Sequence, residues 1–112
     1  MFAAKHTGTA NVAVGYQALD ANTTASHNTA IGLSALSTNT TGTRNTAVGS
    51  QALFASTTAN DNTAFGHTAL DANTTGVQNT GVGSGALGAT TTANNNTAVG
   101  YLTLSVNTTG AN

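Results

Sequence analysis

The chain has 112 residues, a formal net charge of −1 and 4% charged residues, against about 25% in ordinary globular proteins. Its two basic residues provide no electrostatic footprint for nucleic acid or anionic lipid, and the absence of cysteine excludes disulfides and thiolate metal sites. No apolar run approaches the about 20 residues of a membrane span, so we expect no membrane insertion.

A 17-residue repeat organises the chain. Copies or close variants of NTAVG begin at six evenly spaced asparagines: Asn11, Asn28, Asn45, Asn62, Asn79 and Asn96. We therefore divide the single domain into a partial first unit and six repeats: 1–10, 11–27, 28–44, 45–61, 62–78, 79–95 and 96–112. A disordered polar tract has no physical reason to keep this spacing, whereas stacked structural repeats do.

The repeat unit reads N-T-A-V-G-x-x-A-L-x-x-N-T-T-G/A-x-x. It is too short for a helical hairpin, and its threonine and valine disfavour helix. The alternating T-A-V-G segment predicts a strand with Thr46 and Val48 on one side and Ala47 on the other, and the glycine predicts a sharp corner. We expect a second strand near A-N-T-T. The predicted fold is an all-β parallel solenoid, or β-roll, of about six coils.

Two columns of apolar residues are the predicted core. The fourth position of the repeat holds Val14, Ile31, Val48, Phe65, Val82 and Val99. The ninth position holds Leu19, Leu36, Leu53, Leu70, Leu87 and Leu104. Two large side chains per coil barely offset the ordering of 17 residues, so we expect several copies to associate.

Small residues in the strands suggest where such copies would meet. The third position places alanine where larger residues could stand, which predicts a close approach to another chain through Ala13, Ala30, Ala47, Ala64 and Ala98. Apolar residues near both ends, Met1 and Phe2 with Leu102 and Val106, predict head-to-tail stacking into a filament.

The letters NVAVGYQAL, NTTG and NTAVG resemble repeats in phage tail fibres and bacterial surface proteins. They are also similar to the head repeats of trimeric autotransporter adhesins, although the coil here is longer. The resemblance covers nearly the whole chain. It implies a left-handed β-roll, a homotrimer, and an extracellular, cell-surface or virion location.

The ionisable residues are too few and too scattered for catalysis. His27, Arg44 and Asp61 occupy one column of successive repeats, and His67 lies four residues before Asp71. Neither set provides the convergent ligands of a metal site or an acid–base pair. We expect no catalytic residue, no metal and no cofactor, and hence no enzyme.

Three functions remain open. The first is a structural module of a self-assembling fibre, and the second is an adhesin or receptor-binding head that recognises a cell-surface glycan, for example through Tyr16 or Tyr101. The third is ice binding by threonine columns. Against ice binding, Thr23 and Thr24 are adjacent, so in a strand they would point to opposite faces.

Overall fold

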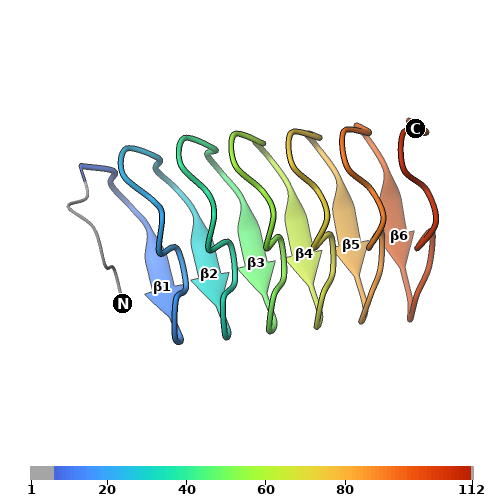
Figure 1. Ribbon diagram of the computed structural model, residues 1–112, viewed down its shortest axis with the longest axis horizontal. Coiled ribbons are helices and arrows are strands. Elements are labelled where there is room, and N and C mark those ends of the chain that lie inside the picture. Colours follow the sequence, from blue (N-terminus) through green and yellow to red (C-terminus); the bar gives the residue numbers. More distant parts are fainter. Residues whose placement is uncertain (1–6, 112) are drawn as a thin grey trace.

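The computed structural model describes residues 7–111. In this range the chain is all β-strand and turn, without a helix. Six three-residue strands form one sheet: β1 (Val12–Val14), β2 (Thr29–Ile31), β3 (Thr46–Val48), β4 (Thr63–Phe65), β5 (Thr80–Val82) and β6 (Thr97–Val99). The strands are parallel, follow chain order and pair residues 17 apart (Figure 1). The predicted β-solenoid is therefore confirmed.

Each coil contains one strand, so the second strand expected near A-N-T-T is wrong. The segment after Asn39 forms bends, and the residues before it form turns. Hydrogen bonds between coils continue through these turns: the Leu53 N–H donates to the Ala69 carbonyl at 3.0 Å and the Ala55 N–H to the Asp71 carbonyl at 2.9 Å. The coils therefore remain joined around most of their circumference without a second extended segment.

The glycine after each strand makes the predicted corner. Gly49 has a φ of 133°, and a Cβ placed on it would lie 2.5 Å from the carbonyl oxygen of Gly66 in the next coil. Both the backbone conformation and this close approach exclude a side chain. The glycine column is thus required by the stacking itself.

The core leucines adopt an unusual backbone conformation. Leu53 has a φ of 52° and Leu70 a φ of 54°, in the left-handed region that costs a non-glycine residue about 1–2 kcal/mol. This conformation curls the chain inward, and both side chains are fully buried. Burial of a leucine contributes about 1.5–3 kcal/mol, which is enough to offset the strain.

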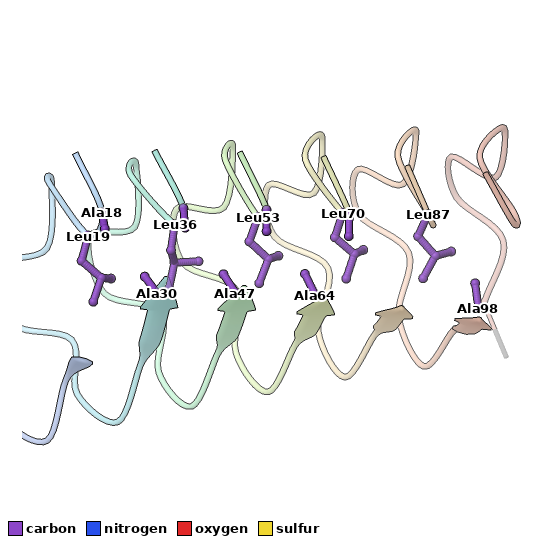
Figure 2. Packing of buried hydrophobic residues seen from close by; sticks show 13 residues of the cluster. Ala18, Leu19, Ala30, Leu36, Ala47, Leu53, Ala64, Leu70, Leu87 and Ala98 are labelled. Atoms are coloured by element: carbon purple, nitrogen blue, oxygen red, sulfur yellow. The ribbon is translucent and has the colours of Figure 1, made fainter. Parts of the chain in front are cut away.

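The leucine column and the strand alanines form the core. Leu19, Leu36, Leu53, Leu70 and Leu87 are fully buried, whereas Leu104, in the last coil, is 49% exposed. Figure 2 shows the leucines opposite the alanines of the strands. Ala47 and Ala64 are fully buried in this cluster.

The other half of the predicted core is wrong, because the fourth-position column faces outward. Its members are half-buried or exposed: Val14, Ile31, Val48, Phe65, Val82 and Val99. The solenoid measures only 20 × 16 Å across. Its two walls lie so close that a leucine on one wall leaves room for no more than a methyl group on the other.

This correction also removes the predicted alanine interface. The side chains of Ala30, Ala47, Ala64 and Ala98 lie inside the coil, and Ala13 is partly buried against the same cluster. None of these residues in β2, β3, β4 or β6 has a methyl group available to another chain. The sequence correctly predicted that Ala47 and Val48 point to opposite sides of the strand. It wrongly placed Val48 inside the coil and Ala47 outside.

A single chain already buries as much surface as a compact protein of its mass. Its accessible surface is 5063 Å², whereas about 5,600 Å² is expected for a monomer of this mass. The expectation that a thin roll lacks burial is therefore not supported. Any association of copies would therefore depend on the chemistry of the exposed surface.

Gly81 stands where the other five coils have alanine, and we expect Gly81→Ala to stabilise the protein. A Cβ there would lie 3.1 Å from the Ala86 carbonyl oxygen and 3.5 Å from Leu70 Cγ, a tight contact that the other coils accommodate. Loss of glycine flexibility in the unfolded chain should contribute about 0.4–1 kcal/mol, measured by urea denaturation.

Gly83 is the matched control for this substitution. It lies two residues further on, with a φ of 129°, and a Cβ placed on it would collide with the Gly100 carbonyl oxygen. Gly83→Ala should lower the free energy of unfolding. If both variants are destabilised equally, the strand alanines do not occupy equivalent places.

Candidate functional site

An asparagine column inside the solenoid holds neighbouring coils together. The Asn45 N–H donates to Asn28 Oδ1 at 2.9 Å, its Nδ2 donates to the Ala59 carbonyl at 2.7 Å, and its Oδ1 accepts from the Asn62 N–H at 3.0 Å. The same pattern recurs at Asn79. The asparagines therefore form a ladder, and its fully buried amides are satisfied by the stacking.

A second buried column is interrupted. Asn39 Nδ2 donates to the Gly42 carbonyl and Asn73 Nδ2 to the Gly76 carbonyl, each at 3.0 Å. In the coil between them the position is Ser56, whose buried hydroxyl has no hydrogen-bond partner. The serine side chain is shorter than asparagine and does not reach the carbonyl three residues further on.

We expect Ser56→Asn to stabilise the fold by restoring this bond. The new amide would donate to the Ala59 carbonyl, which already accepts from Asn45, just as the Ala25 carbonyl accepts from Asn11 and Asn22. Its Oδ1 would be buried without a partner, as it is in Asn39, but it replaces the Ser56 hydroxyl, which also has none, so the donated bond is the net gain. One satisfied buried bond should add about 0.5–1.5 kcal/mol to the free energy of unfolding. The reverse change, Asn39→Ser, should lower it, and thermal denaturation of both variants checks the pair.

The outward side of the six strands presents a regular surface, and we call it the sheet face. It comprises two columns, Val12, Thr29, Thr46, Thr63, Thr80 and Thr97 beside Val14, Ile31, Val48, Phe65, Val82 and Val99. The apolar column is substantially exposed, reaching 56% at Phe65 and 67% at Val99. Nothing on either column carries a charge.

Figure 1 shows the strands side by side along the solenoid, so this apolar column runs across every coil. Tyr16 and Leu33, just beyond the glycine corners of the first two strands, are also exposed. Continuous exposed apolar patches mark interaction surfaces in soluble proteins. The sequence contained the alternation that creates this face, but not the information about which side is covered.

Arg44 and Asp61 form an ion pair on the surface. Arg44 Nε and Nη2 donate to the two carboxylate oxygens of Asp61 at 2.6 and 2.9 Å. This hydrogen bond lowers the pKa of Asp61 and raises that of Arg44. Because both side chains are exposed, the pair contributes little to stability. His27 lies in the same column.

Burial raises the pKa of the Asp71 carboxyl. Its ionised form therefore costs some stability at neutral pH, and that cost disappears as the pH falls through the folded-state pKa. His67 contributes only a weak opposing charge. Among residues 7–111 no three His, Asp or Glu residues gather as a metal site.

The predicted contacts at the ends of the solenoid are only partly visible. Leu102 and Val106 are 48% and 88% exposed in the last coil, while Met1 and Phe2 lie outside the described residues. Head-to-tail stacking stays a prediction. Tyr16 and Tyr101 are both exposed but sit in the first and last coils, so they do not form one glycan platform.

Within the described range no helix has the length and apolarity needed to cross a bilayer. Comparison with known proteins finds no matching family model, curated protein or solved structure. The similarity to fibre and adhesin repeats therefore rests on the repeated motif alone.

Proposed function

We propose that this chain is a structural module of an extracellular or virion fibre, and that its copies associate through the sheet face. The observation that carries the proposal is the column of half-buried or exposed apolar side chains on all six strands, without an intervening charge. A soluble protein that acts alone rarely leaves such a column open to water.

The chemistry of the face supports a partner with the same repeat. The two columns repeat at one strand spacing, about 4.8 Å, so a second copy aligned alongside would meet equivalent residues at every coil. Threonine and valine methyl groups would be buried together, and the interface would grow with each added coil. Similarity to trimeric repeats makes a homotrimer, with each chain facing two others, the assembly that we propose.

The test is the mass of the purified protein in solution, measured by light scattering. Val48→Lys combined with Val82→Lys places charges in the middle of the face, on either side of Phe65 in the same column. We expect the native chain to be a trimer and the double variant to be a folded monomer of 10.9 kDa. A charged pair buried without partners would cost several kcal/mol in the assembly.

Thr58→Lys combined with Thr75→Lys is the matched control. These residues are exposed and lie away from the strands, at the bends of two neighbouring coils. This variant should keep the native mass. A native chain that is monomeric and fully folded at micromolar concentration would contradict the proposal, as would equal dissociation of both variants.

A further inference from the structure

A second regular surface runs along the bends, and we call it the Thr24 column. Its members are the second threonines of each Thr-Thr pair: Thr24, Thr41, Thr58, Thr75, Thr92 and Thr109. All six are exposed. The first threonines of the pairs lie beside them and are half-buried or exposed, so adjacent threonines do not alternate between inside and outside. The segment is a bend rather than a strand, so strand alternation does not apply to it, and the Thr24 column is a single line of exposed side chains.

The two threonine columns differ in what their hydroxyls do. In the first column, Thr40 donates to the Thr57 carbonyl at 3.2 Å and Thr74 to the Thr91 carbonyl at 3.1 Å, so these hydroxyls tie coils together. Within residues 7–111, by contrast, no hydroxyl of the Thr24 column is hydrogen-bonded to the protein. These hydroxyls are free to bind something outside the chain.

The uniformity of the Thr24 column has no internal cause. A column of equal exposure three residues further on holds five different residues, His27, Arg44, Asp61, Gln78 and Asn95. Burial and hydrogen bonding explain the uniform interior columns but not this one. Valine has the same branched shape as threonine and would suit the same backbone, so the repeated element is the combination of hydroxyl and methyl group.

The shape and chemistry of the column exclude most partners. It is a line of single side chains, one per coil, along a solenoid 36 Å long, which offers far less than the about 800 Å² per partner of a standard protein interface. It has no aromatic or arginine residue to anchor a protein. It also has no charge to hold an ion, so the partner must itself be uncharged and periodic.

We infer that the Thr24 column binds the surface of ice. A crystal of water repeats the same hydrogen-bonding groups along a line, and this column repeats a hydroxyl and a methyl group once per coil, about 4.8 Å apart. Each contact is weak, but the stacked coils hold all of them in one orientation, so little freedom is lost on binding. The inference is independent of association through the sheet face.

The experiment measures thermal hysteresis, the gap between the melting and freezing points of a single ice crystal in protein solution. We expect the native chain to open such a gap and to shape the crystal into facets. Thr58→Lys with Thr75→Lys should abolish the gap, because two bulky charges interrupt the middle of the column. The sheet-face control, Val48→Lys with Val82→Lys, should retain it whether or not the copies stay associated.

Absence of a gap for the native chain would overturn the inference, as would loss of the gap in the sheet-face variant alone. Circular dichroism checks that each variant is folded. Should the lysine variant unfold, Thr58→Ala with Thr75→Ala removes the same groups without adding charge, and it should likewise abolish the gap. Light scattering on the same samples reports association separately, so the two proposals fail independently.

Discussion

Leu53→Asp is expected to unfold the protein at neutral pH. Leu53 is fully buried in the middle of the core column, with leucines of neighbouring coils before and after it. Truncation to alanine alone would cost about 2–5 kcal/mol, and an unpaired buried carboxylate adds several more. Since small domains are stable by about 5–15 kcal/mol, the far-ultraviolet spectrum should lose its native form and the melting transition should disappear.

Phe54→Asp is the matched control for this change. Phe54 is the next residue, is 39% exposed, and stands in a column that already holds aspartate at Asp20 and Asp71. This variant should fold with a melting temperature close to that of the native chain. Equal damage at positions 53 and 54 would contradict the assignment of the leucine column to the core.

Ala47→Phe is expected to prevent folding rather than assembly. The methyl group of Ala47 is fully buried against the leucine column, and the solenoid is only 16 Å deep along its shortest axis. A ring in this space would displace leucines from several coils and separate the strand from the opposite wall. Overpacking typically costs about 1–3 kcal/mol, and a core this thin has little capacity to adjust. Urea denaturation should show a large loss of stability or no folded state.

Val48→Phe introduces the same side chain one residue away and should be tolerated. Val48 lies on the sheet face, where the next coil already carries Phe65 at the equivalent position. The free energy of unfolding should change little. If Val48→Phe were the more damaging of the two, the fourth-position column would be inside the coil, as hydrophobicity alone predicts.

Repetition alone determined most of the architecture. Spacing of 17 residues, glycine at the corner and alternation in T-A-V predicted a parallel solenoid, one strand of each coil and the leucine core. These features follow from local rules: a residue at a fixed offset meets its own copy in the next coil, and so asparagine stacks on asparagine and glycine approaches glycine.

Only the tertiary structure decided which side of the strand is covered. Hydrophobicity assigned Val48 to the interior and Ala47 to the surface, and the reverse is true. The width of the coil depends on where the turns place Leu53, whose left-handed backbone conformation no propensity favours. Once that leucine fills the narrow interior, a methyl group is all that fits opposite it. The larger side chains must then face outward, where they form the sheet face.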